Sequence, residues 1–282
     1  MLSKVDPWNA VAEGYTGAAG ELFRAHSRNV LSHAQVTPEM EVVDIACGPG
    51  TLTTQLADLG AKVTALDFSR QMLAILKRHL HQNAVCNVAV READGQDLPF
   101  PENAFDASFS LFGLMFYPDR VKGYAEMFRT LRPGGRAYVS SWSKMSDSPL
   151  FLVMAEALQR LDLTRSAPAY DITSLENPDV LASEMIAAGF GDVRVSKLEH
   201  VSIFRSAEEL WESLVAGSAP ITVIKSQMPS EDWSAKSEEA LNLIRAHAGP
   251  FPARLGTVAW LGSGRKPDAA SFQSQPDDYL PS

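Results

Sequence analysis

The chain has 282 residues, of which 45% are hydrophobic and 21% are charged. This composition is typical of a globular protein with a substantial core and excludes collagen-like, coiled-coil and disordered chains. The net charge is −9 and no dense run of Lys and Arg occurs, which argues against a protein that binds the phosphate backbone of nucleic acids.

No membrane, secretory or metal signal is visible in the sequence. No apolar run approaches the roughly 20 residues that span a bilayer, and the N-terminal residues lack the apolar stretch of a secretory signal. Cys47 and Cys86 are the two cysteines, too few for a disulfide scaffold or a zinc site built on cysteines. We therefore expect a reduced, cytoplasmic protein that binds no metal and does not associate with a membrane.

The first 36 residues are expected to form an N-terminal helical cap. Apolar residues from Val11 to Leu31 recur near helical spacing, and glycines interrupt the first stretch. His26 and His33 share one face of this helix. Because no acidic or cysteine partner stands at ligand spacing, we expect both imidazoles to be exposed to solvent.

From residue 37 onward, short apolar runs alternate with amphipathic stretches. The predicted strands are residues 41–46, 62–66, 87–91, 105–111 and 136–141. The predicted helices are residues 51–59, 69–81 and about 117–131, with Ser69 as the N-cap of the second helix. Alternation at this spacing predicts a Rossmann-like α/β fold, in which a parallel sheet carries helices on both faces.

Beyond residue 142 the alternation loosens. Further helices are predicted at 150–161, 178–188, 207–215 and 231–248, and strands at 193–198 and 256–263. We expect one domain over residues 37–265, with about 143–178 inserted as a helical cover. Residues 266–282 are rich in Ser, Gln, Pro and Asp, which predicts a flexible C-terminal tail.

The most informative segment is the turn Val43-Asp44-Ile45-Ala46-Cys47-Gly48-Pro49-Gly50-Thr51, which follows the first predicted strand. Glycines in this position let the backbone approach a ligand and expose amides at the start of a helix. The turn departs from the dinucleotide fingerprint G-x-G-x-x-G because position 46 is Ala and no third glycine follows. A nicotinamide oxidoreductase is therefore disfavoured, whereas a purely structural turn stays an alternative.

Two acids follow at the ends of the next two predicted strands. Asp67 ends the second strand, where a carboxylate can accept hydrogen bonds from both hydroxyls of a ribose. Asp94 lies just beyond the third strand. Both acids and the glycine turn would line one crevice at the carboxyl edge of the sheet, where open α/β sheets bind ligands. The alternatives are a helix-capping role for Asp67 and an ordinary turn role for Asp94.

Five motifs in this order resemble the class I S-adenosylmethionine-dependent methyltransferases, particularly the small-molecule group that includes the ubiquinone/menaquinone C-methyltransferases. The motifs are V-V-D-I-A-C-G-P-G, the acid in A-L-D-F-S, A-D-G-Q-D-L-P-F, F-D-A-S-F-S-L-F-G-L and L-R-P-G-G-R. The resemblance covers about residues 40–142. It implies a seven-stranded, mostly parallel sheet in which residues 256–263 run antiparallel beside 193–198, and S-adenosyl-L-methionine as the cofactor.

The resemblance also assigns roles to individual residues. The glycine turn would face the methionine moiety, the acid after the second strand would bind the ribose, and the following apolar residues would pack against the adenine. The implied cofactor-binding residues are Asp44, Ala46, Cys47, Gly48, Gly50, Asp67, Phe68, Met72, Asp94, Gly95 and Leu111. The residue type at position 46 departs from the usual Gly of the family. Cys47 is interpreted as a small turn residue and not as a nucleophile.

An aromatic run after the fourth predicted strand is expected to wall the acceptor site. The predicted substrate-pocket residues are Tyr15, Phe112, Met115, Phe116 and Trp142. The Asn/Asp-Pro-Pro-aromatic turn of amino-nucleobase methyltransferases is missing at this place, which excludes that chemistry. No His, Asp or Glu is marked as a base, so no catalytic residue is assigned.

The predicted activity is transfer of a methyl group to an O, N, S or C nucleophile of a small, apolar or aromatic molecule. We expect a monomer or homodimer that has no nucleic-acid partner. Two alternatives stay open. One is a protein that binds S-adenosylmethionine without transferring the methyl group, and the other is a methyltransferase that acts on a macromolecule.

Overall fold

The computed structural model describes residues 5–16, 18–160 and 174–268. Most of the predicted C-terminal tail and residues 161–173 of the predicted cover lie outside the described residues. In the described part of the chain, no helix has both the length and the apolar character needed to cross a membrane.

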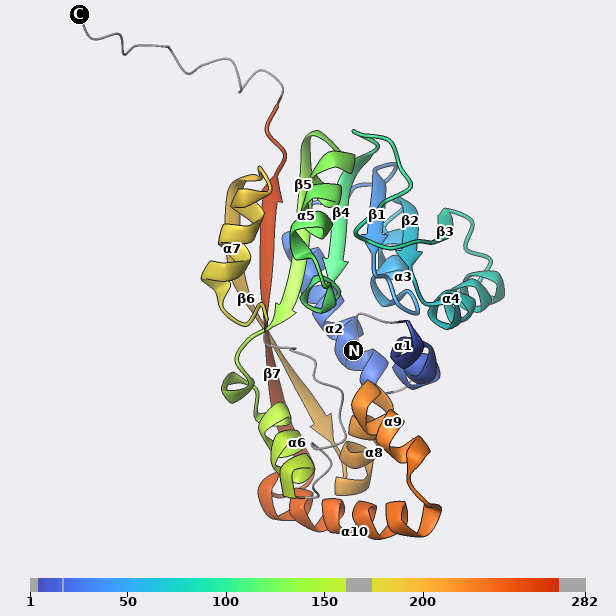
Figure 1. Ribbon diagram of the computed structural model, residues 1–282, viewed down its shortest axis with the longest axis vertical. Coiled ribbons are helices and arrows are strands. Elements are labelled where there is room, and N and C mark those ends of the chain that lie inside the picture. The colour runs from blue at the N-terminus through green and yellow to red at the C-terminus, as the bar shows by residue number, and fades with distance from the viewer. Residues whose placement is uncertain (1–4, 17, 161–173, 269–282) are drawn as a thin grey trace, which may run out of the picture.

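The centre of the molecule is a seven-stranded sheet with the order β3-β2-β1-β4-β5-β7-β6 (Figure 1). The strands are β1 (Glu41–Ile45), β2 (Lys62–Asp67), β3 (Val88–Glu92), β4 (Phe105–Leu111), β5 (Leu131–Trp142), β6 (Gly191–Phe204) and β7 (Ala253–Arg265). Every pair from β3 to β5 is parallel, whereas β7 runs antiparallel to both β5 and β6. The prediction of a mostly parallel sheet with one antiparallel strand is confirmed.

The register of the parallel strands brings their carboxyl ends to one edge of the sheet. Ile45 at the end of β1 is level with Leu66 in β2, and Asp67 is level with Glu92 at the end of β3. The side chains of residues 42–45 in β1 are all buried, as expected for a parallel strand covered on both faces. The turns that follow these strands therefore meet at this edge.

The helices have bounds close to those predicted, with one addition. They are α1 (Asp6–Val11), α2 (Ala18–His33), α3 (Thr51–Asp58), α4 (Arg70–Gln82), α5 (Arg120–Thr130), α6 (Pro149–Arg160), α7 (Pro178–Ala187), α8 (Ala207–Gly217), α9 (Ala219–Gln227) and α10 (Ser230–His247), with short 3-10 helices η1 (Ala12–Thr16), η2 (Leu114–Phe116) and η3 (Met145–Asp147). Helix α9 was not predicted. Ser69 caps α4, as expected, by accepting a hydrogen bond from the Met72 amide.

Two boundaries differ from the prediction for local reasons. Helix α5 begins later than expected because Asp119 is its N-cap and accepts a hydrogen bond from the Lys122 amide. Strand β5 begins earlier, at Leu131, although residues 132–135 were expected to form a turn. The pairing with β4 shifts between Leu131 and Arg136, so the glycine turn is accommodated as an irregularity within the strand.

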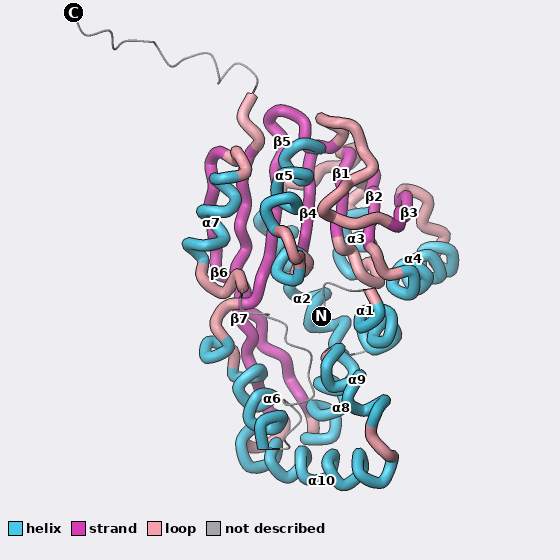
Figure 2. Tube along the Cα trace, viewed as in Figure 1, coloured by secondary structure: helices cyan, strands magenta, loops and turns pink. Residues whose placement is uncertain are grey.

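The far ends of β6 and β7 extend beyond the parallel sheet and carry a separate group of helices (Figures 1 and 2). Strand β7 pairs with β5 from Arg265 to Ala259. From there to Ala253, β7 pairs with β6 and no longer with β5. Helices α6, α8 and α10 pack around this two-stranded extension. Residues 149–160 of the predicted cover form α6, which packs against α10 and β7.

Candidate functional site

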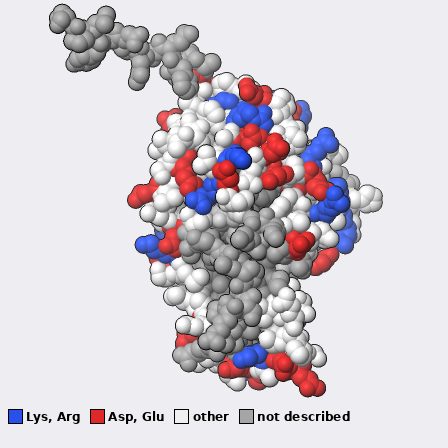
Figure 3. Space-filling model, in the orientation of Figure 1, with Lys and Arg blue, Asp and Glu red and all other residues white. Residues whose placement is uncertain are grey.

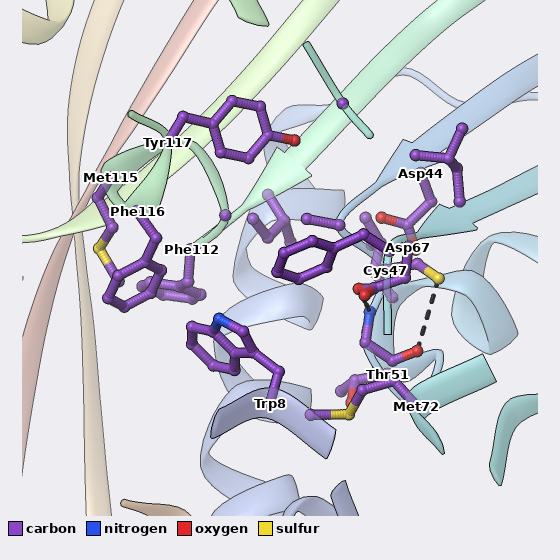
Figure 4. Close-up of a pocket in the computed structure, with 18 of the residues that line it drawn as sticks. Trp8, Asp44, Cys47, Thr51, Asp67, Met72, Phe112, Met115, Phe116 and Tyr117 are labelled. Atoms are coloured by element: carbon purple, nitrogen blue, oxygen red, sulfur yellow. Dashed lines mark hydrogen bonds between the residues drawn. The ribbon is translucent and has the colours of Figure 1, made fainter. Parts of the chain in front are cut away.

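A cavity opens at the carboxyl edge of the parallel strands, beneath α1 and η1 (Figure 4). The volume of the cavity is about 180 Å³. The lining residues are Trp8, Tyr15, Phe23, Ser27, Asp44, Ala46, Cys47, Gly48, Pro49, Thr51, Leu52, Leu66, Asp67, Phe68, Met72, Ala93, Asp94, Gly95, Gln96, Leu111, Phe112, Gly113, Met115, Phe116, Tyr117, Pro118 and Trp142. This set includes every residue that the sequence analysis assigned to the cofactor and acceptor sites except Gly50.

The glycine turn leaves room for a ligand at one position and packs tightly at the next glycine. Gly48 has φ +56°, and a Cβ built on it would meet no heavy atom within 4 Å, so the turn leaves open space there. Gly50 has φ +89°, and its added Cβ would lie 2.3 Å from the Leu76 side chain. The absence of a side chain at Gly50 therefore serves the packing of the turn on α4.

Asp67 at the end of β2 accepts hydrogen bonds from backbone amides in the turn after β1 and in the turn after β2. The Gly48 amide donates to Asp67 Oδ2 over 2.8 Å, and the Ser69 amide donates to Oδ1 over 2.8 Å. Burial raises the pKa of Asp67, and these two hydrogen bonds oppose the rise. The Phe68 amide opposes the rise as well. Because an ionised carboxylate offers about four acceptor positions, these three amides leave room for a ligand hydroxyl.

Asp44 is the second buried acid of the cavity, with 2% of its surface exposed. The Thr53 hydroxyl donates to Asp44 Oδ2 over 2.6 Å. Burial raises the pKa of Asp44 to about 7, against the effect of the Thr53 hydrogen bond, and the charge of Asp67 raises it further. A cationic ammonium group placed beside this carboxyl would favour its ionised form.

The surroundings of Cys47 support its interpretation as a turn residue and not as a nucleophile. Its side chain is buried, and its thiol lies 3.5 Å from the Gly48 carbonyl oxygen. Burial raises the pKa of the Cys47 thiol, and the charges of Asp44 and Asp67 add to that rise. The thiolate required of a nucleophile is therefore disfavoured.

The turn after β3 places Asp94 and Gly95 against Tyr117. Asp94 Oδ1 accepts a hydrogen bond from the Gln96 amide over 2.9 Å, which is the turn role that the sequence left as an alternative. A Cβ on Gly95 would lie 1.8 Å from the Tyr117 hydroxyl, so only glycine fits there. Burial raises the pKa of Tyr117, and the charges of Asp67 and Asp94 add to this, so the phenol stays protonated. We call Asp44, Gly48, Asp67, Asp94 and Gly95 the acid half of the cavity.

The other part of the cavity, which we call the aromatic half, is formed by rings from distant segments. They are Trp8 of α1, Tyr15 of η1, Phe23 of α2, Phe112 after β4, Phe116 of η2 and Trp142 at the end of β5. The rings contact one another in pairs: the centroids are 5.0 Å apart for Trp8 and Phe116, 5.2 Å for Tyr15 and Phe23, and 4.2 Å for Phe112 and Trp142. Figure 4 shows Trp8, Phe112 and Phe116 gathered on one side, away from the acids.

The sequence analysis missed Phe23 and Ser27 as lining residues of this half. Both lie on α2, where the apolar spacing identifies a buried face but carries no signal for a cavity. Trp8 also lines this half, although it is not among the five predicted substrate-pocket residues.

The expectation that His26 is exposed is wrong, whereas His33 is exposed as predicted. His26 is fully buried because α2 packs its face onto β6 and onto the ends of β4 and β5. Its Nε2 lies 3.0 Å from the Thr257 hydroxyl of β7. Burial lowers the pKa of His26 to about 4, and the neighbouring His200 adds to the effect.

The N-terminal segment is held over the cavity by contacts with α4. The Ser69 hydroxyl donates to Asn9 Oδ1 over 2.7 Å, and Val11 and Ala12 pack against Met72. In the described part of the chain, no group of three or more His, Cys, Asp or Glu side chains is placed to hold a metal ion.

Comparisons with known proteins show what this chain is similar to in sequence and in fold. Residues 42–135 match the family model described as "Methyltransferase domain". A demethylmenaquinone methyltransferase of Mycolicibacterium vanbaalenii is 34% identical over 188 residues, which are 61% of this chain and 76% of that protein. A demethylmenaquinone methyltransferase of Renibacterium salmoninarum is 35% identical over 167 residues, which are 58% of this chain. The match spans 66% of that protein, a little less than two thirds of its length.

Among solved structures, the YcgJ protein of Bacillus subtilis superposes with a TM-score of 0.56 at 15% identity. The match covers 86% of this chain and 99% of that one. At this identity the likeness concerns the fold alone.

Proposed function

We propose that this chain, which belongs to the class I S-adenosylmethionine-dependent methyltransferases, transfers a methyl group from S-adenosylmethionine to a small, apolar or aromatic acceptor. The observation that carries the proposal is that one cavity joins an acid half to an aromatic half. The relatives named above are quinone methyltransferases by name, which favours an acceptor of the flat, apolar kind.

The residues of the acid half suit this cofactor. Asp67 lines the cavity and keeps acceptor capacity for the ribose hydroxyls, and the carboxyl of Asp44 would suit the ammonium of the methionine part. The open space at Gly48 would let the backbone approach the cofactor closely, and Asp94 and Gly95, which also line the cavity, would bind the adenine edge. When bound, S-adenosylmethionine supplies a methyl group already activated by its sulfonium leaving group.

The aromatic half would orient the acceptor and exclude water. Among the described lining residues, this half contains no Asp, Glu, His or Lys. The chain would therefore act mainly by holding the acceptor in line with the methyl group, an effect of proximity and orientation. An acceptor that carries its electron pair at neutral pH needs no base from the protein, which favours acidic phenols, acidic thiols, aromatic amines and acidic carbon atoms.

We further propose that the acceptor is a free small molecule and that nucleic acid is not a partner. On the face shown in Figure 3, basic side chains are interspersed with acidic ones and form no continuous basic surface. Together with the net charge of −9, this distribution disfavours binding to a polyanion. The oligomeric state that we propose is a monomer or a homodimer.

The proposal is tested in two steps with the full chain. S-adenosylhomocysteine should raise the melting temperature, whereas NAD should not. Stabilisation by NAD alone would refute the cofactor. A screen with S-adenosylmethionine labelled in its methyl group should then transfer label to at least one member of a panel of quinones, phenols, amines and thiols. Stabilisation without transfer to any of them would favour a protein that binds the cofactor without methylating.

A further inference from the structure

His26 lies behind the aromatic half, at the meeting point of α2 with four strands. None of its surface is exposed. Its imidazole contacts Trp142 edge to face, with centroids 5.2 Å apart and planes at 85°, and contacts Phe112 in the same way at 5.7 Å and 78°. His26 itself is not a lining residue of the cavity, so it contacts the wall and not the acceptor.

The orientation of the imidazole is fixed by Thr257. The Thr257 hydroxyl is buried on β7, 3.0 Å from His26 Nε2 and 3.5 Å from the carbonyl oxygen of His200. The Thr257 hydroxyl and Nε2 are joined by a hydrogen bond in either tautomer of the imidazole, because a hydroxyl can both donate and accept. Nδ1 has no hydrogen-bond partner among the described residues, so Thr257 provides the one polar anchor of the ring there.

The two rings that His26 contacts form a wall under strain. Phe112 has φ +57°, a left-handed conformation that is strained for a bulky residue. Its amide donates to the Ser140 carbonyl over 3.0 Å, and its ring stacks on Trp142 at 4.2 Å. A strained backbone persists only where its surroundings hold it, and His26 provides the contact on the side away from the cavity.

We propose that His26 is a positioning residue for methyl transfer: anchored by Thr257, it fixes Phe112 and Trp142 in the orientation in which they receive a flat acceptor. This inference rests on the proposed function. A general-base role is not part of it, because the ring is separated from the cavity by the wall.

The test compares His26→Leu, which cannot bind Thr257, with His26→Gln, whose amide nitrogen can still donate to it. Thr257→Val removes the anchor while leaving the imidazole, and His33→Gln on the exposed face of α2 is the matched control. The probe is 2-naphthol, whose dissociation constant is measured by calorimetry in the presence of S-adenosylhomocysteine. The environment of Trp142 is followed by near-UV circular dichroism, with Trp142→Phe identifying its signal.

We expect His26→Leu to weaken 2-naphthol binding about tenfold, the size of a lost aromatic contact, and to remove the Trp142 signal. The 2-naphthol affinity of His26→Gln should stay within about threefold of the wild type, and that of Thr257→Val should lie between those of His26→Leu and His26→Gln. The affinity for S-adenosylhomocysteine should be the same in all these variants as in the wild type. His33→Gln should match the wild type in every measurement.

Unchanged 2-naphthol affinity and an unchanged Trp142 signal in folded His26→Leu would overturn the inference. Equal losses in His26→Leu and His26→Gln, or a parallel loss of cofactor affinity, would reduce His26 to a core residue. If the wild type does not bind 2-naphthol, the wall does not receive flat molecules and the inference fails. If it binds 2-naphthol but transfers no label to any acceptor, the proposed function fails, while the part of the inference in which His26 fixes Phe112 and Trp142 to receive a flat molecule stands.

Discussion

The acid half and the aromatic half of the cavity are built in opposite ways. The acid half consists of the last residues of β1 and β2 and of the turns that follow β1 and β3. Its acids are held by backbone amides and hydroxyls close by in space, as when Gly48 and Ser69 donate to Asp67. The aromatic half collects single rings from α1, η1, α2 and the ends of β4 and β5. A donor site can therefore be specified by one recurrent strand–turn–helix unit, whereas an acceptor site depends on how separate units pack.

This difference extends to electrostatics. In the acid half, burial raises the pKa values of Asp44 and Asp67, so folding disfavours the ionised form of these carboxyls. Behind the aromatic half, burial lowers the pKa of His26, so folding disfavours the protonated form of its imidazole. The two halves should therefore respond oppositely to pH and separately to mutation.

The largest expected effect is on the acid half. Asp67→Ala should weaken binding of S-adenosylhomocysteine by at least about a hundredfold, because hydrogen bonds to a charged group are each worth about 1.5–3 kcal/mol. Asp97→Ala, at an exposed acid in the turn after β3, is the control and should bind as the wild type does. Titration calorimetry measures both, and equal affinities of the two variants would show that the wrong acid has been assigned.

The second prediction concerns pH and compares the two halves directly. The folded pKa of His26, about 4, lies below its unfolded value of 6.5, so the unfolded chain binds more protons between these values. The contribution of His26 to stability is therefore complete above pH 6.5 and declines by on the order of 3 kcal/mol as the pH falls to about 4. For Asp44, with a folded pKa of about 7 against 3.8, stability instead declines as the pH rises from 3.8 to 7.

The pH prediction is measured as a difference between proteins, because the two contributions partly cancel in the wild type. Urea unfolding between pH 4 and 7 should show the wild type gaining stability over His26→Gln as the pH rises. Against Asp44→Asn, the wild type should lose stability over the same range. Parallel curves for all three proteins would contradict the opposite behaviour of the halves.

A smaller effect should be confined to the aromatic half. Phe116→Ala removes the edge contact with Trp8 and should lower acceptor affinity about tenfold, while S-adenosylhomocysteine binds as before. If Phe116 is mainly a core residue, the variant instead loses roughly 3–5 kcal/mol of stability and both affinities fall together. The melting temperature, cofactor affinity and turnover of the one variant distinguish these results, and a folded variant with unchanged turnover removes Phe116 from the acceptor site.

The smallest predicted effect separates strain from ligand contact in the glycine turn. Gly48→Ala places a methyl group in the open space at the cavity and should reduce S-adenosylhomocysteine affinity about fivefold, beyond the 1–2 kcal/mol of stability that a left-handed Ala costs. Gly249→Ala is the matched control. Gly249 also has a left-handed φ, +79°, and open space around an added Cβ, but it is not a lining residue of the cavity. Equal cofactor affinity in the two variants would show that Gly48 does not approach the ligand.

Several features of the fold were predictable because they depend on neighbours in the sequence. The short, mainly apolar strand β1, the cap of α4 by Ser69 and the glycine turn after β1 are local properties, and the structure has each of them. Helix α9 and the early start of β5 were not predictable. The first lies beside α8 and α1, and the second depends on a shifted pairing with β4, so both need partners from elsewhere in the chain.

The sequence by itself determined the order of the strands along the chain, the mostly parallel sheet and the positions of Asp44, Asp67 and Asp94 at its carboxyl edge, since each follows from a short run and the turn after it. Only the tertiary structure decided which face of α2 is buried. That choice places Phe23 in the cavity and His26 behind Phe112 and Trp142. The physical reason is that periodicity shows a helix has an apolar face, whereas the strands packed against that face determine which of its polar residues are buried with it.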